Sequence, residues 1–163
     1  MTDYRAFARS MNRDEFVERF PHPFLLVTRD HTSDATREFQ TRDISALELE
    51  NGRPKRTQTE AFLVNREGSA ANSMVTVGRA TNMDIVLSSP SVSKLHAYFQ
   101  RNIDGSGWTF ADAGSRNGTV LNGQLLAHKS NEPVKSGDII VFAKIFRAEF
   151  LDPAQAYVQL SAS

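Results

Sequence analysis

Three polar segments in the second half of the chain carry side chains that could bind an anion. Each follows a short apolar run and combines cationic, hydroxyl or amide groups: Gly78-Arg79, Ser91-Val92-Ser93-Lys94-Leu95-His96 and Gly114-Ser115-Arg116-Asn117-Gly118. Arginine and lysine supply positive charge, and serine and asparagine supply neutral hydrogen bonds. This combination suits a small anion with several oxygen acceptors, such as a phosphate group.

Each segment also has an explanation that involves no ligand. An exposed arginine such as Arg79 is most often solvated surface, and Asn117-Gly118 is a frequent turn sequence in β-hairpins. His96 stands between Leu95 and Ala97, which is typical of a buried structural histidine. The binding interpretation therefore depends on whether the fold brings the three segments together.

The residues from position 60 onward follow the two-residue period of β-strands. Short runs rich in β-branched and aromatic residues lie at 61–64, 74–77, 84–87, 97–100, 108–111, 119–121, 138–142 and 146–151. Turn dipeptides such as Asn122-Gly123 separate most of them. Eight or more strands at this spacing, with no helical stretch between them, predict a β-sandwich or barrel. Such a fold gathers loops at its ends, where they can form a binding site.

Residues 1–59 differ in composition from the rest of the chain. Charged residues are about twice as frequent there as in 60–163, although acidic and basic residues balance in both parts. Eight of the nine glycines lie after residue 60. The turn Asn51-Gly52 and the basic run 53–56 precede this change, so we place a domain boundary within residues 50–59.

The N-terminal part contains patterns for two short helices and one strand. Apolar residues recur on one helical face at Tyr4, Phe7, Ala8 and Met11. Asn12 and Glu15 have the spacing of a capping box, which predicts a second helix containing Phe16. Phe24 to Thr28 is a predicted strand that would add to an edge of the sheet. The helical face would pack against the sandwich, and docking on a partner is the alternative.

The composition excludes several classes of protein. The chain has 163 residues, of which 40% are hydrophobic, and no cysteine, so it can form a core but no disulfide framework or thiolate metal site. We expect no metal and no cofactor. The balance of 19 basic against 19 acidic residues disfavours nucleic acid as a partner. No apolar run approaches the ~18–20 residues of a membrane span, and no signal peptide opens the chain. We therefore expect a cytoplasmic protein with no membrane partner.

The common sequence motifs of catalysis are absent as well. The chain has no Gly-x-Ser-x-Gly elbow, no His-Glu-x-x-His helix and no phosphate-binding Gly-x4-Gly-Lys-Ser/Thr loop. Ser93 and His96 could supply a nucleophile and a base, but no orienting acid or oxyanion site can be identified. We expect a binding protein and not an enzyme.

Five motif blocks in one order resemble the forkhead-associated (FHA) domain over about residues 60–152. The blocks are Gly78-Arg79, Asn82-x-Asp84-Ile-x-Leu87, Val92-Ser93-Lys94-x-His96-Ala97, Asp112-x-Gly-Ser-x-Asn117-Gly118-Thr119-x-x-Asn122-Gly123 and Gly137-Asp138-x-Ile140. The resemblance implies a mainly β fold, a sandwich of about eleven strands. Residues 1–59 would be a charge-rich N-terminal extension of mixed α/β structure, and 153–163 a C-terminal tail.

Members of this family bind phosphothreonine peptides in extended form across loops at one end of the sandwich. By this likeness Arg79 would pair with the phosphate through its planar fork of donors, and Ser93 would donate its hydroxyl. Lys94 stands where the family commonly has arginine and would act as a point charge. Arg116 occupies a variable position, where it would add charge or obstruct the site. Asn117 would hydrogen-bond the peptide backbone.

Further motif residues resemble supports of the loops. Gly78 and Gly118 would permit backbone geometry that a Cβ hinders. His96 would tie the second loop to its neighbours, and Asn122 would brace the third loop. Ser91 lies where the family often selects the residue three after the phosphothreonine, and its short neutral side chain predicts no demand for aspartate there.

The resemblance predicts a phosphothreonine-dependent protein-binding module in Ser/Thr kinase signalling. Its partner would be a phosphothreonine-containing protein or peptide, either such a kinase or a kinase substrate. The alternative is a scaffold or oligomerisation module that keeps the fold and binds without phosphate. Thr57 and Thr59 follow the basic run 53–56, a pattern typical of basophilic kinase substrates, so the domain could also capture its own phosphorylated threonine.

Overall fold

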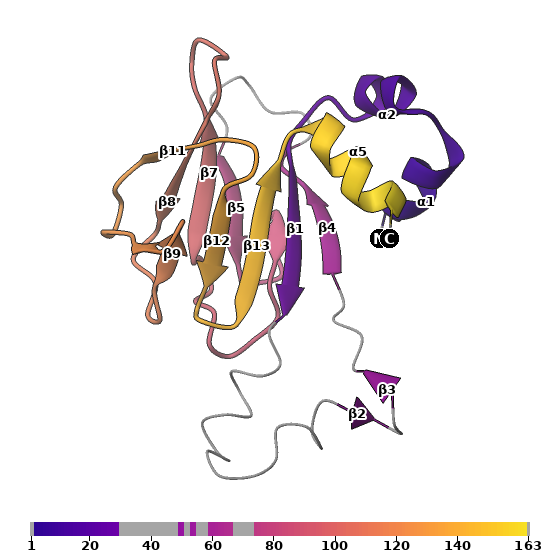
Figure 1. The fold of residues 1–163 in the computed structure, drawn as a ribbon. Coiled ribbons are helices and arrows are strands. Elements are labelled where there is room, and N and C mark those ends of the chain that lie inside the picture. Colours follow the sequence, from indigo (N-terminus) through magenta and orange to yellow (C-terminus); the bar gives the residue numbers. More distant parts are fainter. Residues whose placement is uncertain (1, 30–48, 51–52, 55–58, 67–73, 163) are drawn as a thin grey trace.

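The computed structural model describes residues 2–29, 49–50, 53–54, 59–66 and 74–162 (Figure 1). Within these residues, eleven strands form two sheets: β1 (Phe24–Arg29), β4 (Thr59–Leu63), β5 (Met74–Gly78), β6 (Ile85–Val86), β7 (Ala97–Arg101), β8 (Trp108–Asp112), β9 (Thr119–Leu121), β10 (Gln124–Leu125), β11 (Glu132–Val134), β12 (Ile139–Phe142) and β13 (Phe146–Leu151). The strand orders are β10-β9-β12-β13-β1-β4 and β11-β8-β7-β5-β6. A separate two-stranded ribbon pairs β2 (Leu49–Glu50) with β3 (Arg53–Pro54).

This architecture confirms the predicted mainly β sandwich and its number of strands. Among the described strands, every pairing within the two sheets is antiparallel except that of β5 with β6. Alternation of buried and less buried positions along β5, β7 and β13 reflects the two-residue period of a strand with one face on the core.

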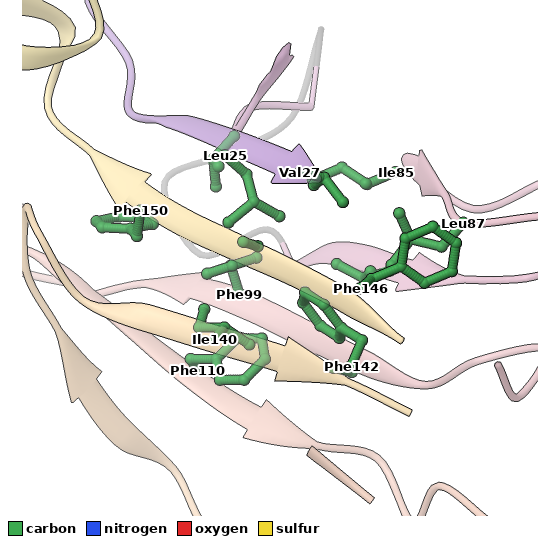
Figure 2. Close-up of a cluster of buried hydrophobic side chains, with 14 of the residues drawn as sticks. Leu25, Val27, Ile85, Leu87, Phe99, Phe110, Ile140, Phe142, Phe146 and Phe150 are labelled. Carbon is green, nitrogen blue, oxygen red and sulfur yellow. The ribbon is translucent and has the colours of Figure 1, made fainter. Parts of the chain in front are cut away.

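The main core fills the space between the two sheets. Figure 2 shows side chains of β1, β12 and β13 pointing toward those of β7 and β8. The ring centroids of Phe99 and Phe110 lie 4.6 Å apart, and those of Phe99 and Phe150 lie 5.6 Å apart. Phe110 also meets Phe142 edge to face at 5.9 Å. These aromatic contacts join the two sheets and hold the strand ends that carry the loops.

The strand predicted at Phe24–Thr28 is confirmed, but its predicted place at an edge is wrong. β1 lies inside the larger sheet, between β13 and β4, and β4 forms the edge. Phe24 through Val27 are all buried because both faces of β1 are covered. Leu25 and Val27 face the main core, whereas Phe24 and Leu26 face a second core under the helices. A continuous apolar run is typical of such a two-sided strand.

The two N-terminal helices are confirmed at α1 (Tyr4–Ser10) and α2 (Arg13–Arg19). Both bonds of the predicted capping box form, from Glu15 N to Asn12 Oδ1 at 2.9 Å and from Asn12 N to Glu15 Oε2 at 3.0 Å. The second core joins these helices to the outer face of the larger sheet through Ala8, Phe16, Phe24, Leu26, Leu151, Ala156 and Leu160. The predicted packing of the helices on the sandwich therefore occurs.

The C-terminal residues were expected to be a tail and instead form helix α5 (Pro153–Ala162). The Asp152 carboxylate accepts from Gln155 N at 2.8 Å, which satisfies a free N–H of the first turn. Ala156 and Leu160 are buried against α1 and α2, and the Tyr157 ring lies 5.5 Å from the Phe16 ring. This packing explains why the segment is ordered. No helix among the described residues is long and apolar enough to cross a membrane.

The helices and the polar loops lie at opposite ends of the sandwich. Figure 1 shows α1, α2 and α5 grouped at one end, with the β12–β13 turn at the other. The start of β9 pairs with the end of β12, so the loop before β9 lies at the end away from the helices. The three polar segments gather there, as described next.

Candidate functional site

Arg79 follows β5 at the point where the strand passes under the Ser93–Lys94 backbone. Its backbone N–H donates to Ser93 O at 2.9 Å, and its side-chain Nε donates to Val92 O at 3.0 Å. Arg79 is exposed, and among the described residues Val92 O is the one hydrogen-bond partner of its side chain. This bond restrains the guanidinium and leaves its terminal Nη donors available to a ligand.

Gly78 permits this close passage. A Cβ at Gly78 would lie 2.1 Å from Lys94 O, a distance that no side chain can tolerate, and 3.0 Å from Ser93 O. The residue has no left-handed φ, so the requirement is for space alone. Glycine at this position lets the first loop and the second loop share hydrogen bonds.

His96 is fully buried and joins all three loops. Its Nδ1 accepts from Ser93 N at 3.1 Å, which requires that Nε2 carry the proton and donate to Gly118 O at 3.0 Å. Its backbone N–H donates to Val77 O at 2.8 Å. Burial lowers the pKa of His96, against smaller opposing effects of the Gly118 bond and the Asp112 charge. The imidazole is therefore neutral and acts as a fixed link between backbones.

Asp112 shapes the third loop, although sequence reasoning gave it no role in the site. Its Oδ1 accepts from Gly114 N and Ser115 N, both at 2.8 Å, and its Oδ2 accepts from the hydroxyls of Ser115 and Thr119. Burial raises the pKa of Asp112, but these hydrogen bonds outweigh it and hold the pKa below its ordinary value. The pattern Asp-x-Gly-Ser, typical of an Asx turn, was the available signal.

Two hydrogen bonds bring the third loop against the second. Arg116 N donates to Ser93 Oγ at 3.0 Å, and Asn117 Nδ2 donates to Ser91 O at 2.7 Å. Residues from segments more than twenty positions apart thus form one surface. The structure brings together all five residues expected to contact the ligand: Arg79, Ser93, Lys94, Arg116 and Asn117.

The resulting surface combines exposed cations with partly buried hydrogen-bonding groups. The side chains of Arg79, Lys94 and Arg116 are exposed, and Ser93 is half-buried. An open depression beside Arg79 is lined by Ser88, Ser89 and Pro90. Such a surface can hold one phosphate group and an extended segment of backbone, because it offers positive charge together with neutral donors and acceptors.

Asn122 connects the β9–β10 turn to the start of β12. Its Nδ2 donates to Asp138 Oδ1 at 3.1 Å, and its Oδ1 accepts from Ile139 N at 2.9 Å. These bonds tie the β9–β10 turn to the start of β12, at the opposite end of β9 from Gly118. Three residues of strand separate Asn122 from the third loop, and its support of that loop stays a prediction.

The turn between β12 and β13 is part of the same end and was not identified from the sequence. Ala143 N donates to Gly118 O at 3.0 Å, so Gly118 O accepts from both this turn and His96. Gly118 itself has a φ of 85°, in the left-handed region that favours glycine. The turn sequence Ala143-Lys144 carries no glycine or asparagine, which is why it gave no turn signal.

Two packed sheets with a polar surface built on loops at one end define a β-sandwich binding module. Residues 75–143 match the family described as FHA domain, and the chain contains an FHA domain, as predicted. FHA domains are phosphothreonine-binding modules, a class of binding domain and not of catalyst.

Two curated relatives share this part of the chain. It is 37% identical over 91 residues to an oxoglutarate dehydrogenase inhibitor of Corynebacterium jeikeium, a match that covers 56% of this chain and 55% of the inhibitor. It is 38% identical over 76 residues to the DNA damage response protein kinase DUN1 of Saccharomyces cerevisiae, covering 44% of this chain and 15% of the kinase. The matches thus span about half of the first relative and a small part of the second.

Solved structures show the same fold. The N-terminal FHA domain of S. cerevisiae RAD53P, in complex with a phosphothreonine peptide, has a TM-score of 0.50 and 22% identity. The match covers 61% of this chain and 90% of that chain. At this identity the likeness concerns the fold.

Proposed function

We propose that the three loops bind a phosphothreonine-containing segment of a partner protein, with Arg79, Ser93 and Lys94 on the phosphate. The observation that carries this proposal is the 3.0 Å bond from Arg116 N to Ser93 Oγ. A serine hydroxyl has one donor and two acceptor sites. Because Ser93 Oγ accepts from the protein, its own hydrogen is available to donate to a phosphate oxygen.

The geometry of Arg79 supports its role as the main phosphate ligand. Its Nε is bonded to Val92 O, which restrains the direction of the guanidinium. The two terminal nitrogens can then offer parallel N–H donors to two oxygens of one phosphate. Such preorientation of the side chain lowers the entropic cost of binding.

Lys94 and Arg116 would supply additional charge from either side of Ser93. Lys94 is a flexible point charge. Arg116 is exposed, and its own backbone N–H donates to Ser93 Oγ. A phosphate carries close to two negative charges at neutral pH, so a second and third cation improve its neutralisation.

Asn117 is suited to hold the ligand backbone. One of its amide hydrogens is bonded to Ser91 O at 2.7 Å, which fixes the side chain at the surface. The amide oxygen and the second hydrogen can accept from and donate to a peptide group. Contacts to the backbone give affinity with little selectivity for the ligand's side chains.

The partner belongs to Ser/Thr kinase signalling in this proposal, either a kinase or a kinase substrate. One curated relative of this region is itself named a protein kinase, and a solved domain of the same fold is in complex with a phosphothreonine peptide. If the domain captured its own phosphorylated threonine, Thr59 would be a poor candidate for that threonine. Thr59 Oγ1 is hydrogen-bonded to Thr28 Oγ1 at 2.9 Å within the sheet, and Thr57 lies outside the described residues.

Matched phosphorylated and unphosphorylated threonine peptide libraries test the function by fluorescence anisotropy. Wild type should select phosphothreonine peptides, and Arg79→Ala should weaken binding by at least about tenfold, since a hydrogen bond to a charged group contributes about 1.5–3 kcal/mol. Arg101→Ala, an exposed arginine at the far end of β7, is the control and should bind as wild type. Equal binding of both libraries would favour the phosphate-independent scaffold instead.

A further inference from the structure

The β12–β13 turn is fixed to the loop that carries Asn117. Ala143 N donates to Gly118 O at 3.0 Å, and Ala143 is buried with 4% exposure. At the adjoining strand ends, Phe142 pairs with Thr119. Neighbouring strands lie ~4.8 Å apart, so the turn is the immediate neighbour of the Asn117–Gly118 backbone.

Both central residues of this turn have left-handed backbone angles. Ala143 has a φ of 53° and Lys144 a φ of 64°. Asparagine and glycine occupy this region more readily than alanine or lysine. Non-glycine residues held in such conformations often lie at ligand sites, so the side chain of Lys144 is a candidate ligand contact.

Lys144 presents an exposed ammonium group at the loop end of the sandwich. Among the described residues, no ion pair or hydrogen bond involves its side chain. Because the neighbouring Ala143 is anchored to Gly118, the base of the lysine is fixed while its four-carbon stem can move over the adjoining loop. The charge is thus positioned near the ligand backbone that Asn117 would hold.

The other side of Gly118 is apolar. Leu125 on β10 is 73% exposed, and its Cδ1 lies only 3.1 Å from where a Cβ at Gly118 would be. Gly118 is therefore flanked by an apolar side chain on one side and by the Lys144 turn on the other. Of these two sides of Gly118, the one toward Lys144 offers a positive charge to an acidic side chain of a ligand that crosses it.

We propose that Lys144 forms a charge-selective subsite that recognises an acidic side chain of the bound phosphopeptide. The proposal rests on the proposed function and adds to it a sequence preference outside the phosphothreonine. The preference is for aspartate, glutamate or a second phosphorylated residue at one position of the ligand. This preference applies only to the part of the peptide that crosses the Asn117–Gly118 loop.

A phosphothreonine-oriented peptide library on wild type and two variants tests this subsite. Wild type should select an acidic residue at one position, and an aspartate peptide should bind about two- to fivefold tighter than its asparagine twin. Lys144→Asn removes the charge and suits the left-handed turn, so the fold is retained and the preference should disappear. Lys144→Glu should reverse it toward a basic residue. The wild-type preference should weaken in 1 M salt.

Lys135→Asn is the matched control, because Lys135 is exposed just before the opposite end of β12. It makes the same change of charge and should leave the library profile unchanged. An acidic preference that persists in Lys144→Asn, or is absent from wild type, would overturn the subsite while phosphothreonine binding stands. Failure of wild type to bind any phosphothreonine peptide would overturn the proposed function and this subsite together.

Discussion

The backbone N–H of Arg116 lies 3.0 Å from the hydroxyl oxygen of Ser93 and donates a hydrogen bond to it. The two residues belong to different loops, so one side-chain atom both fastens the loops and carries a donor for a ligand. Because of this dual role, removing the Ser93 hydroxyl tests ligand binding and loop contact in one variant. Its removal should affect ligand binding much more than folding.

Ser93→Ala should weaken phosphothreonine peptide binding by about 10- to 100-fold, since a hydrogen bond to a charged group contributes about 1.5–3 kcal/mol. The stability lost with the neutral Arg116 bond should be about 1 kcal/mol. Peptide titration by anisotropy and urea unfolding measure the two effects. Ser106→Ala, at the tip of the β7–β8 hairpin, is the control and should change neither by much. Equal affinity of Ser93→Ala and wild type would remove Ser93 from the site.

Gly78→Ala should destabilise the fold by more than about 2 kcal/mol, because the new Cβ would lie 2.1 Å from Lys94 O and the backbone must shift. The matched change is Gly114→Ala, where nothing lies within 4 Å and only the φ of 92° opposes a side chain. That change should cost about 1 kcal/mol. Chemical denaturation compares them, and similar losses for both variants would contradict the close-approach argument.

The stability of the protein should fall as the pH drops below about 6.5, in part because of His96. Burial lowers the pKa of the folded-state imidazole, so below its unfolded value the unfolded state binds more protons. The contribution of His96 is complete above that value and is lost as the pH falls toward the lowered folded pKa. Asp112 also has a lowered pKa, but its contribution is lost only below the ordinary carboxylate range.

Unfolding free energies of wild type and His96→Gln between pH 5 and 8 check this expectation. The variant should be less stable throughout but show a flatter pH profile. His22 has a pKa lowered by burial and by Arg101, so His22→Gln measures the other described contribution. An unchanged slope in His96→Gln would show that the imidazole is not the group responsible.

A chain that starts at residue 60 should fail to fold cooperatively. Such a fragment lacks β1, which pairs with both β13 and β4 and places Leu25 and Val27 in the main core. Each fully buried side chain of this kind contributes about 1.5–3 kcal/mol. The boundary that charge density indicates at residues 50–59 predicts the opposite result. Thermal unfolding of the 60–163 fragment decides between them, with the full chain as reference.

The sequence allowed the strands and the motif residues to be predicted because both have local signals. The two-residue period identified β5, β7 and β13, and the spacing of Asn12 and Glu15 identified a real capping box. The position of β1 inside the sheet depends on its pairing with both β4 and β13, which lie far from it in the sequence. Its four consecutive apolar residues are typical of a strand buried on both faces, a signal that the prediction of an edge strand did not use.

The two parts of the site that were missed differ in kind. Asp112 accepts from four groups within seven residues of it, and the Asp-x-Gly-Ser pattern was a local signal for this role. The β12–β13 turn reaches Gly118 only because β9 pairs with β12, a tertiary contact. Helix α5 did carry a local signal, with Asp152 before Pro153 at the first position, but its short apolar face becomes meaningful only against Phe16.

The pairing of β1 with β13 also bears on how the protein is made. Phe24 and Leu151 are partners, and the three polar loops all lie between them in sequence. During synthesis, the larger sheet cannot close until β13 has left the ribosome. Pairings this distant in sequence usually give folding times of milliseconds to seconds. We therefore expect the loop surface to form late, after β1 and β13 have paired.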